Sequence, residues 1–565
     1  MNLWDQDLRN GKNRRIKLKH VKRYFLLLAV ICGVGLILTR PQIRHLAGQA
    51  SESLKAYYVE AHADAVNQEG FSLSMDGVNI DTKNMQMSSQ MHLLMPLAEA
   101  VDCFKTTITL GEAGEGLIGG RYFEDIAVIP EEKTPDTVLI DITAAAEALD
   151  VDYTWEDGEY QAVLSSLNPE VLPENYDSRI ILNLNEVESQ GTFGTCWAFA
   201  ATAALEASLS NEVLDFSVDH MTMNSGFNIS PTEGGDYNMS LAYLASWKGP
   251  VLEYDDPYGD GMTDESLTAV KHLQEARRID EKNLDEIKSM VMNYGAVESS
   301  LYMSIENEWD VSEDYEPENA AYYYSGDMTP NHDIVIVGWD DHYSRENFNQ
   351  LPEKDGAFVC RNSWGSDFGM DGYFYVSYED SNLGTGSMAY TRLDNTDNYD
   401  KIYQSDLLGW VGTLGYKSES AWFASIYSAE QNETLKALSF YAVDDHTSYD
   451  IYTVMNYSES EDLNRAVYMG SGYLEHGGYY TVDIPQGLPA EAGSRFAVMV
   501  NIKTEGSERP IAIEYQASDL TSGVDISDGE GYVSYDGKNW VSAESEYACN
   551  ICLKAFTNQE ENSNG

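Results

Sequence analysis

The chain has 565 residues, and its 93 acidic against 35 basic side chains give a formal charge of −58 at pH 7. This charge argues against nucleic acid as a partner, because a phosphate backbone would be repelled, and it favours a well-solvated exterior. The chain is too long for one hydrophobic core, while 43% hydrophobic residues, 10 Trp and 38 Tyr indicate folded domains along most of it.

Residues 1–50 read as a basic leader followed by a membrane signal or anchor. Lys and Arg side chains crowd the first 23 residues, and an apolar run covers residues 24–39. A comfortable membrane span needs about 20 residues, so the run is interpreted as a signal peptide or, preferably, a signal anchor in the membrane. The basic flank stays in the cytoplasm. We therefore expect a membrane-anchored or secreted protein, bacterial in type, with everything after Arg40 outside the cell.

Residues 68–167 are expected to form an α/β domain. Two segments, 93–102 and 138–158, each predict a short strand, a helix with an Ala/Leu face and a second strand. The pattern loosely resembles the copper amine oxidase N-terminal-like domain of bacterial surface proteins, a resemblance that implies no catalytic copper site. A generic α/β spacer is an equal alternative, and both interpretations make the domain non-catalytic.

A lone cysteine, Cys196, stands at a glycine-rich turn that leads into a predicted helix ending near Leu209. Its thiol would lie on the first helical turn, where unpaired N–H groups and the positive dipole end favour a thiolate. Gln190, six positions earlier, can direct its amide N–H to the same place. With the Cys196 backbone N–H it would form an oxyanion hole. This stretch predicts a cysteine nucleophile.

The base and the residue that orients it must come from distant sequence. His332 opens a β-branched run that predicts a buried strand through Trp339, and a second strand, 356–361, ends at Asn362. Either a buried cysteine or a histidine at a strand start is, by itself, usually structural. The order Gln, Cys, His, Asn favours a catalytic set instead, with His332 as base and Asn362 as its orienting partner.

This set resembles the papain family of cysteine peptidases, over a stretch that begins near Leu172 and ends near Phe374. The resemblance implies a papain-like α+β catalytic domain over 168–395, with no metal and no cofactor. It also implies further substrate-binding residues: a groove wall at Gly234 and Gly235, an aromatic shield over the His–Asn hydrogen bond at Trp364, and a position beside the pocket for the second substrate residue before the scissile bond at Asp333.

Three departures from the family pattern leave the substrate preference open. Phe193 stands where many relatives carry a disulfide cysteine, so that disulfide is absent. Asp333 replaces a usually small residue, and Phe368-Gly369 replaces Trp-Gly. Asp333 would either place a carboxylate beside an apolar pocket, which favours Lys or Arg in the substrate, or turn away to bind a neighbour. The sequence does not decide between these two.

Residues 396–558 are expected to form a β-sandwich. Strand-like segments at 421–427, 435–443, 449–455 and 495–501 alternate with Gly, Asn and Asp-rich turns. The region resembles the lectin-like domain found behind some bacterial papain-like peptidases, which implies cell-surface carbohydrate as a partner, bound by exposed Tyr side chains and Trp410. Core packing is the more usual role for such aromatics. The CxxC pair Cys549 and Cys552, predicted within a terminal strand, is interpreted as packing rather than zinc or redox chemistry.

Taken together, the sequence predicts an extracellular cysteine endopeptidase that hydrolyses protein or peptide substrates. Two alternatives stay open. One is a catalytically silent surface adhesin that binds carbohydrate, and the other is a transpeptidase or exopeptidase with the same catalytic residues. The domain over 68–167 occupies the place of the family's propeptide without its charged helical pattern, so an inhibitory role for it is also open.

Overall fold

The computed structural model describes residues 72–75, 78–80, 84–87, 92–111, 115–123, 127–130, 133–156, 161–166, 171–182, 184–209, 212–307 and 310–559. The predicted membrane segment 24–39 lies outside these ranges. Within them, no helix combines the length and the apolar character that a membrane crossing requires. The chain divides into two compact units, residues 1–68 with 86–93 and residues 69–85 with 94–565. Apart from β3 and the first residue of β4, the elements described below belong to the second unit.

The N-terminal region has the predicted strand, helix, strand order in both of its segments. Strand β4 leads into α4, which buries one face, and β9 leads into α5, whose first turn is capped by Asp141 accepting hydrogen bonds from the N–H groups of Thr143 and Ala144. Strands β10, β11, β1 and β2 form a sheet in that order. The described elements here are β1 Ser72–Met75, β2 Val78–Ile80, β3 Gln86–Met87, β4 Leu93–Pro96, α4 Leu97–Phe104, β5 Thr107–Leu110, β6 Gly116–Ile118, β7 Arg121–Phe123, β8 Ala127–Val128, β9 Leu139–Asp141, α5 Ile142–Ala148, β10 Val151–Glu156 and β11 Gln161–Ser166.

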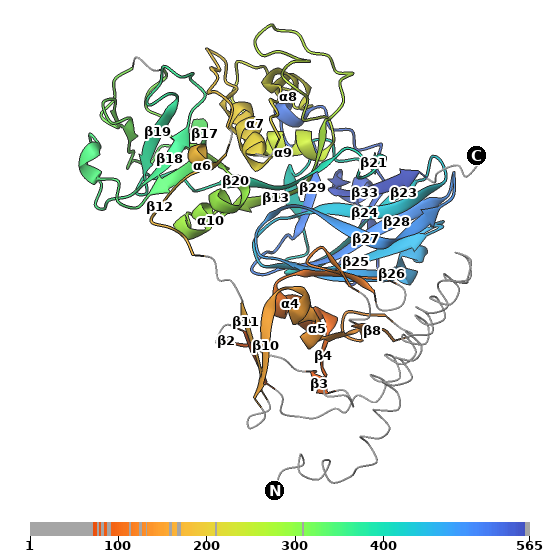
Figure 1. Ribbon diagram of the computed structural model, residues 1–565. Helices are drawn as coiled ribbons and strands as arrows, with labels where there is room; N and C mark the ends of the chain where they lie inside the picture. Colours follow the sequence, from red (N-terminus) through yellow and green to blue (C-terminus); the bar gives the residue numbers. More distant parts are fainter. Residues whose placement is uncertain are drawn as a thin grey trace, which may run out of the picture. The chain divides into compact units, whose positions relative to one another are not determined.

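The central region packs helices against one part of a long, mainly antiparallel sheet (Figure 1). Helix α7 is apolar on nearly every side and is buried between this sheet and helices α8 and α9. The described elements are β12 Asn175–Asp177, α6 Ser178–Ile181, α7 Cys196–Ser208, α8 Val218–Asn224, α9 Tyr237–Ala245, β13 Lys271–Ile279, α10 Leu284–Tyr294, β14 Val297–Leu301, β15 Tyr315–Glu316, β16 Ala321–Tyr322, β17 His332–Asp340, η1 Arg345–Asn347, β18 Ala357–Arg361, β19 Tyr373–Ser377 and β20 Ser387–Asn395.

Strand β17 lies at the middle of that sheet, between β18 and β14, and is buried along almost its whole length. Its β-branched residues fit this position, because a strand covered on both faces needs apolar side chains at successive residues. The predicted strands at 334–339 and 356–361 are both confirmed as parts of β17 and β18.

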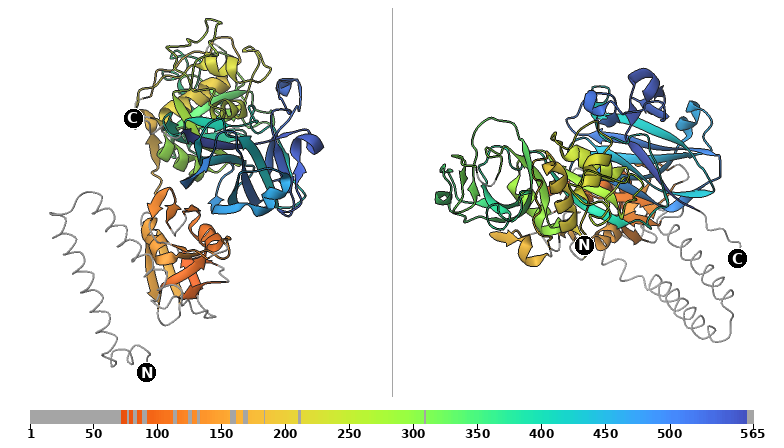
Figure 2. Two further views of the ribbon diagram at one scale, coloured as in Figure 1. Left: turned by 90° about the vertical axis from the view of Figure 1, so that its right-hand side faces the viewer. Right: turned by 90° about the horizontal axis from the view of Figure 1, so that it is seen from above.

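The C-terminal region is a two-layered β-sandwich, as predicted. One layer is built from β27, β24, β33 and β21, the other from β30, β23, β28, β25 and β26, and apolar side chains fill the space between them. The strands, in blue, lie together in each view of Figures 1 and 2. The described elements are β21 Lys401–Tyr403, β22 Gly412–Leu414, β23 Ser420–Ser428, β24 Glu433–Ala442, β25 Thr447–Met455, η2 Ser460–Arg465, β26 Val467–Leu474, β27 Gly478–Ala490, β28 Arg495–Thr504, β29 Ile511–Glu514, η3 Asp519–Thr521, β30 Gly531–Ser534, β31 Val541–Ser542, α11 Ala543–Tyr547, β32 Asn550–Ile551 and β33 Leu553–Gln559.

Two strand pairings join these regions. Strand β13 of the central region pairs with β27 of the sandwich, so that one sheet of 13 strands runs through both. Gly478, at φ +144°, permits this pairing, since a Cβ there would lie 2.1 Å from the carbonyl oxygen of Ala276. Strand β5 of the N-terminal region pairs with β26, the edge strand of the other layer. The sandwich is therefore bound by hydrogen bonds to both of the other regions.

Candidate active site

Cys196 is the first residue of α7, and its side chain is 7% exposed. The residue before it, Thr195, does not cap the helix but hydrogen-bonds through Oγ1 to the Tyr258 hydroxyl at 2.7 Å. That hydroxyl donates in turn to the carbonyl oxygen of Gln190 at 3.0 Å. The Tyr258 hydroxyl therefore anchors the turn that carries the thiol at two points, one before and one after the glycines of that turn.

His332 and Asn362 lie together because they stand at the same end of two paired strands. Strands β17 and β18 are antiparallel, with Val335 opposite Arg361, so the start of one meets the end of the other. His332 Nε2 and Asn362 Oδ1 are 2.8 Å apart, and both residues are buried. With Nε2–H donating to the amide oxygen, the Nδ1 lone pair is left free to accept a proton. That is the tautomer that a general base needs.

Helix α7, which begins at the predicted nucleophile, packs against β17, which begins at the predicted base. The backbone N–H of Asp333, the residue after His332, acts to lower the pKa of Cys196. The start of β17, at His332, is thus placed near the start of α7, at Cys196, although 136 positions separate these two residues in the sequence.

Gln190 is tied to the same strand end as Asn362. Its backbone N–H donates to the carbonyl oxygen of Ser363 at 2.8 Å, and its side-chain Oε1 accepts from Ser363 Oγ at 2.6 Å. Its Nε2 donates to the carbonyl oxygen of Phe193 at 2.7 Å. The amide predicted for the oxyanion hole is therefore fixed within the turn that precedes Cys196, and in this structure one of its N–H groups is used there.

The helix position of Cys196 predicts a thiolate, but the pKa values of Cys196 and His332 in the folded site disfavour one. Burial raises the pKa of Cys196 to about 12, and the nearby Asp333 carboxyl raises it further, against the N–H groups of Asp333, Trp197 and Cys196. Burial also lowers the pKa of His332 to about 4, although its bond to Asn362 works the other way. Desolvation thus disfavours either charge alone. The thiol and the imidazole must exchange one proton between them to form a nucleophile.

Gly234 and Gly235, the glycines predicted for the groove wall, lie in different surroundings. A Cβ on Gly235 would lie 2.6 Å from the Trp197 indole nitrogen, so this glycine lets the loop pack on α7. A Cβ on Gly234 would meet nothing within 4 Å, so its Cβ position faces open space. Gly194, before the nucleophile, comes within Cβ contact of the Glu233 carbonyl, which holds the two loops side by side.

Trp364 lies with its ring centroid 5.0 Å from that of His332, and Phe368 packs edge-on against Trp364. The ring is thus placed to cover the imidazole from one side. The replacement of the family's second aromatic by Phe368 keeps an apolar ring at this place, fully buried in the core behind the site.

Asp333 is 7% exposed, and its Oδ1 accepts a hydrogen bond from Ser300 Oγ of β14 at 2.5 Å. Burial raises the pKa of Asp333 to about 7, and Asp236, at the start of α9, raises it further. Glu298, two residues before Ser300, is wholly buried with Oε2 accepting from the Tyr390 hydroxyl, and burial with Asp333 raises its pKa as well. Of these three carboxyl groups, that of Asp333 also acts on the nucleophile, since it raises the pKa of Cys196.

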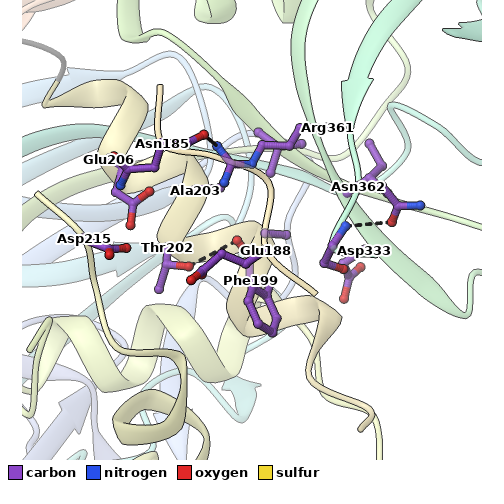
Figure 3. Close-up of a pocket in the computed structure, with 14 residues that line it drawn as sticks. Asn185, Glu188, Phe199, Thr202, Ala203, Glu206, Asp215, Asp333, Arg361 and Asn362 are labelled. Atoms are coloured by element: carbon purple, nitrogen blue, oxygen red, sulfur yellow. Dashed lines mark hydrogen bonds between the residues drawn. The ribbon is translucent and has the colours of Figure 1, made fainter. Parts of the chain in front are cut away.

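A second group of carboxyls behind the site was not predicted. A cavity of about 20 Å³ lies between α7 and the 185–188 segment (Figure 3). Glu188, Glu206 and Asp215 line it, with Arg361 beside them, and Asp333 and Asn362 on its other side. The Arg361 guanidinium donates to the carbonyl oxygens of Asn185 and Glu186, at 2.9 and 2.8 Å. Arg361, the residue immediately before Asn362, is thus a neighbour of all three acidic side chains.

Glu206 shows the largest pKa shift of the three. Burial raises its pKa to about 8, while the Phe216 N–H and the Arg361 charge act to lower it. A charged residue in the alanine-rich run of α7 was the available signal, since charges are rarely buried without a partner. Among the described residues, no group of three or more His, Cys, Asp or Glu has an arrangement that could hold a metal ion.

The variant Glu206→Gln is expected to flatten part of the dependence of stability on pH. Wild type keeps a proton on Glu206 up to about pH 8, whereas in the unfolded chain this proton is lost near 4.5. Stability from this group is therefore full below pH 4.5 and falls by roughly 1.4 kcal/mol per pH unit as pH rises towards 8. Glutamine cannot titrate but still accepts from the Phe216 N–H. Denaturant unfolding of both proteins from pH 4.5 to 8.5 measures the difference, and parallel curves would contradict it.

Two family models match separate parts of the chain. Residues 172–393 match the family model described as papain family cysteine protease, and residues 402–557 match the model described as lectin like domain. A viral cathepsin of Choristoneura fumiferana defective polyhedrosis virus is 24% identical over 222 residues, which are 38% of this chain and 63% of the relative. Mouse pro-cathepsin H is 25% identical over 217 residues, 36% of this chain and 60% of the relative. The chain thus spans less than two thirds of these curated relatives.

Two solved structures share the fold of the central and C-terminal regions. Both are of the clostridial cysteine protease Cwp84, one of them after propeptide cleavage. The first has a TM-score of 0.61 at 24% identity and covers 68% of this chain and 99% of its own. The second, the cysteine protease and lectin-like domains of Cwp84 from Clostridium difficile, has a TM-score of 0.60 at 24% identity and covers 69% and 90%.

Proposed function

Because residues 172–393 form a papain-family domain and residues 402–557 a lectin-like domain, we propose that this protein is a cysteine endopeptidase. The observation that carries the proposal is the 2.8 Å hydrogen bond from His332 Nε2 to Asn362 Oδ1, at the start of the strand against which the helix of Cys196 packs. This bond fixes the imidazole tautomer that can take the thiol proton.

In the proposed reaction, His332 Nδ1 takes the proton of Cys196 as the sulfur attacks the carbonyl carbon of a peptide bond. The Cys196 backbone N–H and the Gln190 amide stabilise the negative oxygen that forms. His332 then gives its proton to the leaving amine, and a water molecule hydrolyses the acyl-enzyme by the reverse path. Asn362 holds the imidazole through both steps.

Incubation of the protein with a diverse peptide library tests this proposal. We expect cleavage within peptides whose two termini are blocked, which separates an endopeptidase from an exopeptidase. Added amine nucleophiles should not become joined to the acyl products, as they would with a transpeptidase. A thiol-directed epoxide should label Cys196 and stop cleavage. Labelling without any cleavage would instead support a silent surface protein.

Asp333 is proposed to set the preference at the neighbouring substrate pocket. Its buried carboxyl and that of Asp236 would attract a Lys or Arg side chain, with a preference over Leu of about 1 to 3 kcal/mol, or roughly 5- to 150-fold in kcat/KM. The preference should grow as pH rises through about 7, where the Asp333 carboxyl loses its proton. Competition between peptides that differ only at this residue measures it.

The matched comparison for this prediction is Asp333→Ala against Ser300→Ala. The first removes the charge, while the second removes only the hydrogen bond to Asp333 Oδ1. Preference for Lys should vanish in the first and persist in the second. If both variants keep the wild-type preference, Asp333 has the alternative structural role, that of a partner for Ser300.

The location and the sugar partner are finer parts of the proposal. Export to the cell surface is supported by the basic leader with its apolar run at 24–39, and one of the structures of similar fold is described as a surface layer associated protein. Carbohydrate binding by the C-terminal domain is supported by exposed rings such as Tyr535, at 63%. Trp410 is less suited, because the Arg278 guanidinium covers its ring at 4.3 Å.

A further inference from the structure

The N-terminal region is bound to the C-terminal sandwich by a strand. Strand β5 runs antiparallel to β26, with Thr107 opposite Gly472, Ile108 opposite Ser471 and Thr109 opposite Gly470. Strands β6 and β7 continue from β5, so the sandwich layer gains three strands at this edge. The addition of a strand to an exposed sheet edge is a recurrent way in which proteins bind extended segments.

Side chains on both sides reinforce this pairing. Thr107 Oγ1 and the Tyr449 hydroxyl are 2.8 Å apart, and Ser448 Oγ donates to Asp102 Oδ1 at 3.2 Å. The Lys105 ammonium lies 3.7 Å from the centroid of the Tyr473 ring. The Tyr473 N–H donates to the carbonyl oxygen of Thr106 at 3.2 Å, beyond the last paired residue. Helix α4 also packs against β26.

Gly470 shows how closely the two strands approach. A Cβ built on this residue would lie 2.7 Å from the Ile108 carbonyl oxygen and 2.8 Å from Thr109 Cα. The three nearest atoms all belong to β5, so the glycine makes room for the N-terminal strand rather than for the sandwich itself. Ile108 and Leu110 of this strand are buried, at 0 and 2% exposure.

The covalent link between the two regions lies elsewhere. The chain passes from β11 to the central region through residues 167–174, and Val171 on this path is 79% exposed. A cut at Val171 would break the backbone without touching a single contact of the β5–β26 pairing.

We propose that the N-terminal domain is a non-covalent partner of the sandwich, and that it stays bound after the chain is cut in this link. The binding surface on the sandwich is the edge of β26, together with Tyr449 and Tyr473. The segment that binds it is the three-stranded unit of β5, β6 and β7 in the same chain, which begins with the β5–β6 hairpin. The proposal does not rest on peptidase activity, because any protease that opens the link would leave the same two fragments associated.

The test uses the full chain with Cys196→Ala, to prevent self-digestion, and a recognition sequence for a site-specific protease inserted after Val171. Complete cutting is checked on a denaturing gel. The fragments should then co-elute in size-exclusion chromatography at about 1 μM protein, which requires a Kd of about 1 μM or lower. Two separate folded fragments under these conditions would overturn the proposal.

Variants then assign the contact. Gly470→Val should weaken the association of the cut fragments by roughly 10- to 100-fold, the scale of an overpacked contact. Thr107→Val, which only loses the bond to Tyr449, should weaken it less. The matched control is Tyr122→Ala on β7, an exposed position at the far side of the hairpin. If Gly470→Val and Thr107→Val both bind like this control, the fragments are held by another surface and the proposed edge is wrong.

Salt gives a second readout. Asp102 and Asp136 both raise the pKa of Asp450 across this contact, after burial as the main cause. Screening of this repulsion should leave the association in 0.5 M salt as strong as at low salt, or stronger. Release of the fragments by salt would mean that ion pairs, and not strand pairing, hold them.

Discussion

Replacement of Cys196 by alanine is expected to abolish peptide hydrolysis while the fold persists. The change removes one buried sulfur atom at the start of α7, but it removes the whole covalent route. The loss in kcat should be on the order of 10⁴-fold or more, as for other covalent nucleophiles. No other described cysteine lies on α7: Cys103 is on α4, Cys360 is on β18, and Cys549 and Cys552 are in the C-terminal region.

The measurement is turnover of a blocked peptide together with the melting temperature. Cys549→Ala is the matched control, since it also removes a buried sulfur, but in the C-terminal sandwich near Ala543. We expect the control to lose some stability and to keep its activity, whereas Cys196→Ala should do the reverse. Activity near the wild-type level in Cys196→Ala would rule out the proposed mechanism.

The variant Gln190→Ala should lower kcat by about 10- to 1000-fold with little change in KM, which is the cost of one lost donor to an oxyanion. The structure adds a second effect, because the Gln190 side chain also links the Phe193 carbonyl to Ser363 Oγ. Loss of both bonds should loosen the turn before Cys196, and we expect a lower melting temperature as well.

Ser363→Ala separates these two effects. It removes the hydrogen bond to Gln190 Oε1 but leaves the Gln190 amide N–H groups in place. A loss in kcat well below that of Gln190→Ala would assign the larger part to the oxyanion. Equal losses in the two variants would mean that Gln190 acts only by holding the turn, and an unchanged kcat in Gln190→Ala would remove it from the site.

The arrangement of the site could be predicted because each part has a local signature. A glycine turn before an apolar helix places Cys196, and β-branched runs place His332 and Asn362 at strand ends. Once the strands pair, their order brings the histidine to the asparagine. The sandwich could be predicted for the same reason, since alternating apolar residues report the strand directly.

The carboxyl groups could not be predicted, because their chemistry depends on burial by residues far away in sequence. A charged residue in the alanine-rich run of α7 marks Glu206 as unusual, but nothing local shows that Arg361 and Asp215 lie beside it. The same holds for the protonation of Cys196, since helix position favours the thiolate while burial in the folded site opposes it. The β5–β26 pairing has no signature either, because an edge strand pairs through its backbone.

The pairing of β5 with β26 also imposes a delay on assembly while the chain is being synthesised. Thr107 and Tyr449 are 342 residues apart, and a ribosome that adds about 5 to 20 residues per second needs roughly 20 to 70 s between them. The hairpin therefore emerges long before β26 exists, with one strand edge bare to any neighbouring chain. This contact cannot close before β26 is made, so interrupted synthesis should leave fragments that aggregate through residues 107–123.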